Sequence, residues 1–327
     1  MNVTDIPVLA QVVRSGFTES RHHGSAVVLA ADGREVLFSA GEVTAPMYPR
    51  SSNKPVQAAA MRSCGLDLDG ELLALAAASH SGEEFHVTGV RKILASAGLT
   101  EDALQCPPAL PLDEAAMRRL LRDGGGPDRV HMNCSGKHAA MLATCVTAGW
   151  PTESYRDPGH PLQREIRATL ERLSGEKVAA TGVDGCGAPL FAVSLTGLAR
   201  AFRSLVLAAP SSAERSVADA VRAHPEWTSG SARSERALMM AVPGLLVKSG
   251  AEGVQAFALA DGRAAAVKVE DGAGRAVPAI TVALLHLLGG WDEAEPGALD
   301  RVADLPVYGG ERVVGRIRAT VGYPHRG

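Results

Sequence analysis

The chain has 327 residues, of which 46% are hydrophobic and 21% are charged, and its net charge at pH 7 is −3. This composition predicts a globular protein with a sizeable core, and it argues against nucleic acid as a partner because the chain carries no basic field. No apolar run is long enough to span a membrane, and the first residues lack the basic and apolar segments of a secretory signal, so we expect a cytoplasmic protein.

The first part of the chain predicts strands followed by helices. The segment from Val8 to Val13 has the composition of a strand, and Gly24 to Ala40 predicts a hairpin that turns at Asp32-Gly33. Three helices are expected next, at residues 55–64, 71–78 and 85–97, and a turn follows each of them.

The middle of the chain is more helical, and its last third returns to strands. Helices are expected over residues 113–122, over 139–146 with Asn133 as the cap, and from His160-Pro161 to Gly175. Strands are expected at 244–250, 253–259, 264–270 and 312–321, with a helix at 278–288. We therefore predict one α+β domain, residues 1–327, in which segments from both chain ends pair into one antiparallel sheet beside a helical block.

Ser51 and Lys54 form an S-x-x-K motif in the turn before the first predicted helix. On a helix, residues three apart share a face, so the lysine amine is expected to lie near the serine hydroxyl. A serine hydroxyl is a poor nucleophile until a base removes its proton, and a desolvated lysine can be that base. The alternative is a surface serine and lysine at a helix start.

Two further segments have the residue types of a Ser-Lys hydrolase. Ser79-His80-Ser81 ends a predicted apolar helix, where a loop could direct a hydroxyl into a cleft, although a helix cap is the simpler interpretation. Lys248-Ser249-Gly250 ends a hydrophobic strand, although Lys248 could equally be a solvated lysine at a sheet edge. The order S-x-x-K, S-x-S, K-S-G is that of penicillin-recognising serine enzymes.

The cysteines divide into two kinds. Five cysteines in a chain without an export signal argue against a disulfide framework. Cys134 and Cys186 lie in Gly-rich polar turns, one followed by Lys137 and the other preceded by Asp184. Cys134, at a predicted helix N-terminus near a lysine, is expected to have a lowered pKa. Two thiolates with nitrogen and water would suit Zn²⁺, whereas the alternative is a pair of buried structural cysteines.

Six motifs together give the chain a resemblance to a known family. They are Arg50-Ser-Ser-Asn-Lys-Pro55, Ser79-His-Ser-Gly-Glu83, Asn133-Cys-Ser-Gly-Lys-His138, His160-Pro161, Asp184-Gly-Cys186 and Lys248-Ser-Gly-Ala-Glu-Gly253. In this order they resemble the Rhizobium-type (class 3) L-asparaginases, the asparaginase II family. The resemblance runs from about residue 10 to residue 320. It implies a fold like that of β-lactamases and penicillin-binding proteins, a homodimer, and hydrolysis of L-asparagine to L-aspartate and ammonia.

The resemblance also implies roles for individual residues. Ser51 with Lys54, and Ser79 with Lys248, would be two catalytic Ser-Lys pairs, with Lys268 as the second choice for the role of Lys248. A zinc ion would be held by Cys134, Lys137 and Cys186. Substrate would be bound by Asp184, Arg50 and Cys134.

Two other functions remain open from the sequence. The chain could be a serine hydrolase of β-lactams or D-Ala peptides, because these enzymes share the Ser-Lys chemistry. It could also be a zinc-binding module without catalytic activity. The preference for asparagine over glutamine is not fixed either, since one methylene changes binding by only about 1–3 kcal/mol.

Overall fold

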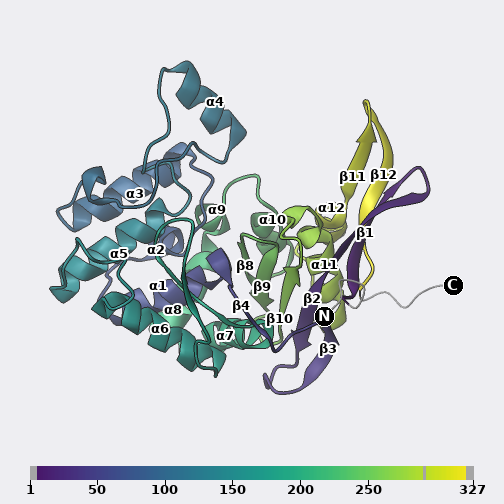
Figure 1. Cartoon of the computed structure of the whole chain (residues 1–327), viewed down its shortest axis with the longest axis horizontal. Helices are drawn as coiled ribbons and strands as arrows, with labels where there is room; N and C mark the ends of the chain where they lie inside the picture. The colour runs from purple at the N-terminus through teal and green to yellow at the C-terminus, as the bar shows by residue number, and fades with distance from the viewer. Residues whose placement is uncertain (1–5, 290–291, 322–327) are drawn as a thin grey trace. The chain divides into compact units, whose positions relative to one another are not determined.

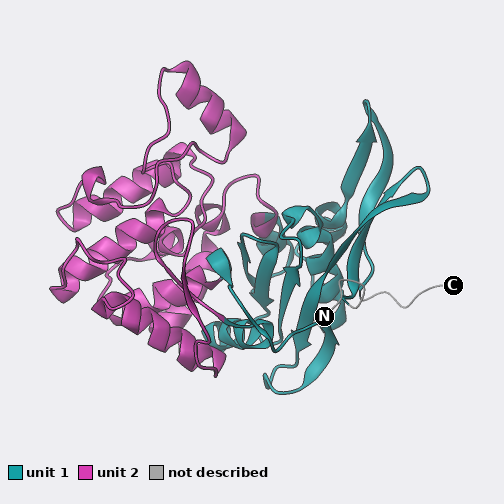
Figure 2. Cartoon of the chain, viewed as in Figure 1, with its two compact units in different colours: residues 1–52, 193–207, 237–327 teal, residues 53–192, 208–236 magenta. Residues whose placement is uncertain are grey.

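The computed structural model describes residues 6–289 and 292–321. The chain forms two compact units, coloured in Figure 2. Unit 1 consists of residues 1–52, 193–207 and 237–327, and unit 2 of residues 53–192 and 208–236. The expectation of a single domain over residues 1–327 stays a prediction.

Unit 1 is built on an antiparallel sheet that contains both ends of the described chain. The strand order is β11-β12-β1-β2-β10-β9-β8, and β3 pairs with β2. In chain order the strands are β1 (Val8–Arg14), β2 (Phe17–Leu29), β3 (Val36–Ala40), β8 (Leu246–Gly250), β9 (Val254–Ala258), β10 (Ala264–Val269), β11 (Leu305–Gly309) and β12 (Arg312–Ala319). Figure 1 shows the purple N-terminal strand β1 beside the yellow C-terminal pair. The predicted α+β class and the sheet formed from both chain ends are confirmed.

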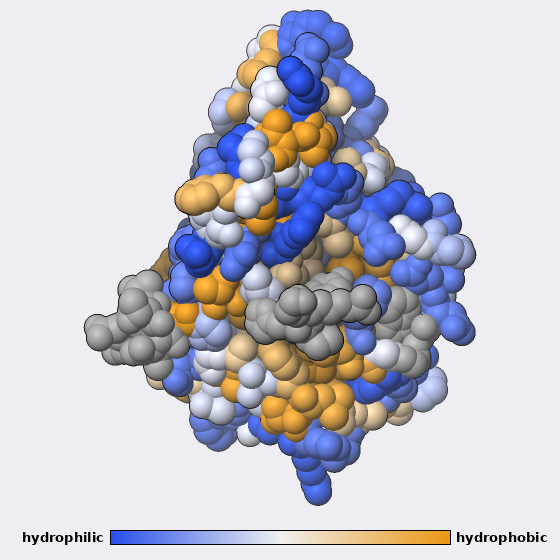
Figure 3. All heavy atoms as spheres, turned by 90° about the vertical axis from the view of Figure 1, so that its right-hand side faces the viewer, coloured by the Kyte–Doolittle hydropathy of each residue, from blue (hydrophilic) through white to orange (hydrophobic). Residues whose placement is uncertain are grey.

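Two helices pack on the sheet and bury its central strands. Helices α7 (Leu195–Leu207) and α11 (Val277–Leu288) contact β2, β9 and β10. Residues Ala26 to Leu29 of β2 are completely buried, as expected for a strand covered on both faces. Several large apolar side chains stay exposed on the hairpins, among them Phe17, Val36 and Tyr308. On the face drawn in Figure 3, hydrophobic patches are separated by hydrophilic side chains.

The sequence predicted the central strands of unit 1 better than its first hairpin. Strands β8, β9, β10 and β12 lie within the predicted ranges, whereas β2 begins at Phe17, seven residues before the predicted start at Gly24. The tight turn that joins β1 to β2 has positive φ at both Ser15 and Gly16, 48° and 82°. This conformation is typical of a two-residue hairpin turn. Strand β11 was not predicted.

Unit 2 is mainly helical. Its elements are α1 (Lys54–Ser63), α2 (Gly70–Ala76), α3 (Glu84–Ser96), α4 (Glu114–Arg122), α5 (Ser135–Ala148), α6 (Pro161–Ser174), the short strands β5 (Thr181–Val183) and β6 (Pro189–Phe191), α8 (Ala213–Ala223) and α9 (Pro225–Thr228). Helix α5 is the centre, since it contacts α1, α2, α3 and α6 and is buried continuously from Ser135 to Cys145. A Cβ atom on Gly136 would lie 2.6 Å from the carbonyl oxygen of Leu75, so only glycine permits α5 to approach α2 so closely.

The structure identifies the N-cap residues of two helices in unit 2. Cys134, not the predicted Asn133, is the N-cap residue of α5, and the Cys134 side chain makes no capping hydrogen bond. His160-Pro161 opens α6 as predicted, and His160 is also its cap, because its Nδ1 accepts a hydrogen bond from the N–H of Leu162. Between α6 and β8, helices α7, α8, α9 and α10 (Ser234–Ala241) were not predicted. No helix in the described ranges has the length and apolar character needed to cross a bilayer.

Candidate active site

Unit 1 presents Ser51 on a short turn that the end of β8 supports. Ser51 lies in a 3-10 helix, Arg50–Asn53, whose first residue has a left-handed backbone with φ of 50°. The Ser52 hydroxyl donates a hydrogen bond of 2.6 Å to the carbonyl oxygen of Pro49. A Cβ atom on Gly250 would lie 2.6 Å from that oxygen and 3.3 Å from the backbone nitrogen of Ser51. The Lys248-Ser249-Gly250 strand therefore packs directly on the serine turn, as only glycine allows.

The lysine of this strand is buried. Lys248 is fully covered by protein, and its ammonium donates a hydrogen bond of 2.8 Å to the carbonyl oxygen of Ser249. Arg50 and Glu252, which both have positive φ, lie 3.6 Å apart as an ion pair beside the same turn. Left-handed backbone at two residues other than glycine is costly and is concentrated at functional sites. The Ser51 turn is therefore held by a close backbone contact and by one ion pair.

Unit 2 brings Lys54, Ser79 and Cys134 together. The Lys54 Nζ lies 2.8 Å from the Ser79 Oγ, 3.0 Å from the Cys134 Sγ and 2.6 Å from the carbonyl oxygen of Ala78. All three side chains are buried. An ammonium has three donors and these partners accept all three, so the lysine head group is fully hydrogen-bonded. The contact between Lys54 and Ser79 was not predicted from the sequence, which paired Ser79 with Lys248.

A buried network fixes the segment that carries Ser79. The N–H of His80 donates to the carbonyl oxygen of Asn133, and its ring Nε2 lies 2.8 Å from the Ser135 hydroxyl. The other ring nitrogen accepts a hydrogen bond from the N–H of Gly82. These bonds tie residues 79–82 to the first turn of α5, where Cys134 lies. Sequence reasoning assigned His80 no such role, because two of its partners, Asn133 and Ser135, lie more than fifty residues away along the chain.

The two thiols that were predicted to bind a metal lie close to the amine of Lys137. The Lys137 Nζ is 3.0 Å from the Cys186 Sγ, and the Asp184 Oδ2 is 3.6 Å from the same sulfur. Cys134 and Lys137 are held by the first turn of α5, and Cys186 by the turn between β5 and β6. Cys134 and Cys186 pack together with Ala188 in one buried cluster. The structure of unit 2 thus gathers Cys134, Lys137, Cys186 and Asp184, as the sequence suggested.

The negative charge of the thiol pair lies on Cys186 and not on Cys134. The hydrogen bond with Cys186, together with burial, raises the pKa of the Cys134 thiol. The same hydrogen bond and the nearby Lys137 ammonium lower the pKa of Cys186, although burial opposes this. The expected lowered pKa of Cys134 is therefore wrong, because the helix N-terminus does not compensate for burial next to a thiolate. Burial also disfavours the charge on Lys137, but the two sulfurs outweigh it and raise the pKa of Lys137.

His138 lies beside these sulfurs, and its hydrogen bonds decide whether it can bind a metal. The N–H of Gln105 donates to the Tyr155 hydroxyl, at 3.2 Å, and that hydroxyl is 2.6 Å from His138 Nδ1. Burial lowers the pKa of His138 to about 4, so the ring is neutral at pH 7. If Tyr155 donates its proton to Nδ1, the ring proton is on Nε2, and the hydrogen bond of the ring with the Cys186 sulfur raises the pKa of His138 against the effect of burial. In this tautomer His138 is a hydrogen-bond donor and not a metal ligand.

The donor set suits zinc only if a lysine takes part. Among the described residues no three His, Cys, Asp or Glu side chains are grouped so that they could hold a metal. Two sulfurs and the Lys137 amine do converge, and Zn²⁺ is bound by four S, N or O donors. Water would complete the set. Cys134, Lys137 and Cys186 thus fit the ion, provided that Lys137 is deprotonated.

The predicted site residues are divided between the two units. Unit 1 holds Ser51, Arg50, Lys248 and Lys268, and unit 2 holds Lys54, Ser79, Cys134, Lys137, Asp184 and Cys186. Each predicted Ser-Lys pair has one member in each unit. The pairing of Ser51 with Lys54 and that of Ser79 with Lys248 therefore stay predictions.

Solved structures provide the first comparison. A putative β-lactamase from Bacteroides dorei is 17% identical with a TM-score of 0.44, and the match covers 80% of this chain and 93% of that one. A β-lactamase from Mycobacterium bovis is 16% identical with a TM-score of 0.42, covering 80% and 94%. A structure of Mglu in its tris and glutamate form is 14% identical with a TM-score of 0.35, covering 86% and 61%. These resemblances are distant.

Sequence comparison is more informative. No curated protein matches the chain in sequence. The family profile described as L-asparaginase II matches residues 10–319, a range that contains all of the candidate site residues. The chain therefore belongs to the L-asparaginase II family of amidohydrolases.

Proposed function

We propose that the protein hydrolyses L-asparagine to L-aspartate and ammonia through a serine acyl-enzyme that uses two Ser-Lys pairs. Family membership supports the substrate class. The observation that carries the chemistry is the buried contact of 2.8 Å between the Lys54 Nζ and the Ser79 Oγ. A lysine beside a serine hydroxyl, both shielded from water, is the arrangement that activates a hydroxyl or returns a proton to a leaving group.

In the proposed first step, Ser51 Oγ attacks the side-chain carboxamide carbon of asparagine. Lys54, three residues further on, first loses one of its three ammonium protons; as a free amine it takes the hydroxyl proton, and backbone N–H groups around Ser51 stabilise the oxyanion. Lys54 hydrogen-bonds to Ser79, so the proton has a short path to that hydroxyl. Ser79 with Lys248 then protonates the leaving ammonia, the C–N bond breaks, and an aspartyl ester remains on Ser51.

Water hydrolyses the ester in the second step. The same lysines act in reverse, since the group that protonated the leaving ammonia can now accept a proton from water. Ser51 is released with its proton, and aspartate leaves. The α-carboxylate and α-ammonium of the substrate need fixed counter-charges, and Arg50, Asp184 and the Cys134 segment are the proposed ones.

Zinc held by Cys134, Lys137 and Cys186 would supply a fixed positive charge for substrate placement. Because Lys137 carries a raised pKa beside the Cys186 thiolate, it must lose its proton before its nitrogen can bind the ion. The chain itself contributes the buried site that holds the two sulfurs and the amine together.

The homodimer and the cytoplasmic location expected from the sequence also stay predictions.

An ammonia-release assay with L-asparagine, L-glutamine and D-asparagine, with and without a chelator, tests the proposal. We expect release from L-asparagine by the wild type and none by Ser51→Ala. Near wild-type turnover by Ser51→Ala with loss in Ser79→Ala would make Ser79 the nucleophile and refute the assignment to Ser51. Hydrolysis of nitrocefin without ammonia release would favour a β-lactam hydrolase, and tight zinc binding without turnover of any amide would favour a binding module.

A further inference from the structure

Unit 1 contains a cavity that no step of the proposed reaction uses. Its volume is about 400 Å³, which is large enough for a small molecule of amino-acid size. Apolar walls are formed by Ile6, Pro7, Pro46, Met47 and Leu195. The polar groups that line it are few: the Lys268 ammonium, the Ser25 hydroxyl and the carboxylates of Glu42 and Glu270. Apolar walls with a few convergent polar groups are typical of a ligand site.

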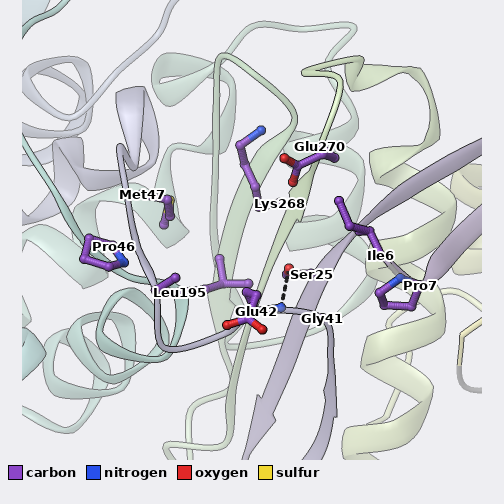
Figure 4. A pocket seen from close by; sticks show the side chains of 11 residues that line it. Ile6, Pro7, Ser25, Gly41, Glu42, Pro46, Met47, Leu195, Lys268 and Glu270 are labelled. Carbon is purple, nitrogen blue, oxygen red and sulfur yellow. Dashed lines mark hydrogen bonds between the residues drawn. The ribbon is translucent and has the colours of Figure 1, made fainter. Parts of the chain in front are cut away.

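These polar groups have a definite arrangement. Figure 4 shows Lys268 and Glu270 near one end of the cavity, Glu42 towards the other, and Ser25 between them. Lys268 is half-buried, and its ammonium donates to the carbonyl oxygen of Val269 at 2.5 Å. In the described chain no carboxylate lies within ion-pair distance of Lys268, and burial lowers its pKa. A half-buried ammonium without an ion-pair partner favours binding of an anion.

Strand register separates the Lys268 end of the cavity from the Ser51 turn. Gly250 of β8 is opposite Val254 of β9, Val254 is opposite Lys268 of β10, and Lys268 is opposite Ser25 of β2. Gly250 is the residue that packs on the Ser51 turn. Neighbouring strands lie about 4.8 Å apart, so the Lys268 backbone is roughly 10 Å from that of Gly250. The cavity extends from Lys268 over β2 and over the segment after β3 as far as Met47, and a ligand held at Lys268, Ser25 and Glu42 need not occupy the place of the substrate.

We propose that this cavity is a second binding site, for a free L-α-amino acid with an uncharged or basic side chain. Its α-carboxylate is bound by Lys268 and its α-ammonium by the adjacent Glu270. The side chain extends past Ser25 towards Glu42, whose carboxylate accepts hydrogen bonds from an amide or an ammonium and repels a second carboxylate. The site therefore prefers asparagine to aspartate. This assigns Lys268 to ligand binding and not to the catalytic role considered for it as an alternative to Lys248.

Binding stoichiometry tests the proposal without using activity. L-Asparagine is titrated by calorimetry into the full chain carrying Ser51→Ala, so that it is not consumed. Two molecules per chain are expected, and one when Lys268→Met is added. The matched control is Lys92→Met, which removes an exposed lysine from α3 of unit 2 and should leave two. Ammonia is measured in the same samples, because turnover by Ser51→Ala would refute the nucleophile and not the second site.

The selectivity of the site provides the second arm. L-Aspartate should bind the second site at least tenfold more weakly than L-asparagine, because of the Glu42 carboxylate. Glu42→Gln should remove most of that difference while keeping the shape of the cavity. Thermal melts of every variant confirm folding. A single binding event in the Ser51→Ala protein, or two events that survive Lys268→Met, would overturn the proposal. Loss of both events on Lys268→Met in a folded protein would also overturn it, since Lys268 would then belong to the substrate site.

Discussion

Gly250→Ala isolates the contact between the lysine strand and the serine turn. The added Cβ would lie 2.6 Å from the Pro49 carbonyl oxygen. Because Cβ atoms in proteins do not approach other atoms more closely than about 3.0 Å, the backbone must move by at least 0.4 Å. The methyl group adds no polar atom. Overpacking of this kind costs about 1–3 kcal/mol, and displacement of a nucleophile by a substantial fraction of 1 Å can reduce kcat by roughly tenfold to a hundredfold. We expect both effects in Gly250→Ala.

The matched control is Gly274→Ala, in the same unit, where an added Cβ meets nothing within 4 Å. Steady-state ammonia release gives kcat and KM for both variants, and thermal melts give their stability. Gly274→Ala should keep the kcat of the wild type. A folded Gly250→Ala enzyme with wild-type kcat would refute the idea that the strand end positions Ser51.

Three further predictions concern unit 2. Cys186→Ala should weaken zinc binding at least a hundredfold in a competition assay with a chromogenic chelator, whereas Cys64→Ala, which changes a cysteine outside the proposed ligand set, should not; equal affinities would remove Cys186 from that set. Burial lowers the pKa of His80 and His86, the latter to about 4, so both are neutral in the folded state. Their contribution to stability is present above about pH 6.5 and falls as the pH drops below it; that of His86 is lost as the pH falls towards 4 and amounts to about 3 kcal/mol. Urea unfolding midpoints that do not change over this range would contradict it. Tyr155→Phe removes the hydroxyl that bonds to His138 and Gln105, and urea unfolding should show a loss of about 1–3 kcal/mol; an unchanged free energy of unfolding would show that the hydroxyl is not needed.

The sheet was predictable because its strands have local signals. Alternating or continuous apolar residues bounded by Gly and Asp-Gly turns predicted β8, β9 and β10 closely. The start of β2 was not predicted, because the strand continues through exposed polar residues such as Glu19 and Arg21, which local pattern does not distinguish from a loop. Helices α7, α8, α9 and α10 (Ser234–Ala241) were missed, although α7 is apolar and Ser194, directly before it, accepts a capping hydrogen bond from the N–H of Gly197.

The candidate site was predictable as a set of residues but not as a set of contacts. Motif spacing identified Lys54, Ser79 and Cys134, yet it gave no indication that one ammonium bonds to both of the others. That contact depends on how α1, α2 and α5 pack, which is a tertiary property. The charge state of the thiols was predicted wrongly for the same reason. Helix position suggested a thiolate at Cys134, whereas the pairing across the cluster places the charge on Cys186.

The central claim is that asparagine becomes covalently attached to the enzyme through a serine. Mass spectrometry of enzyme that is acid-quenched during turnover of L-asparagine, followed by peptide mapping, tests it most directly. The proposal predicts an aspartyl ester on the peptide that contains Ser51, and none in Ser51→Ala. Rapid turnover without any adduct under conditions where deacylation is slowed, or an adduct on the peptide that contains Ser79, would contradict it.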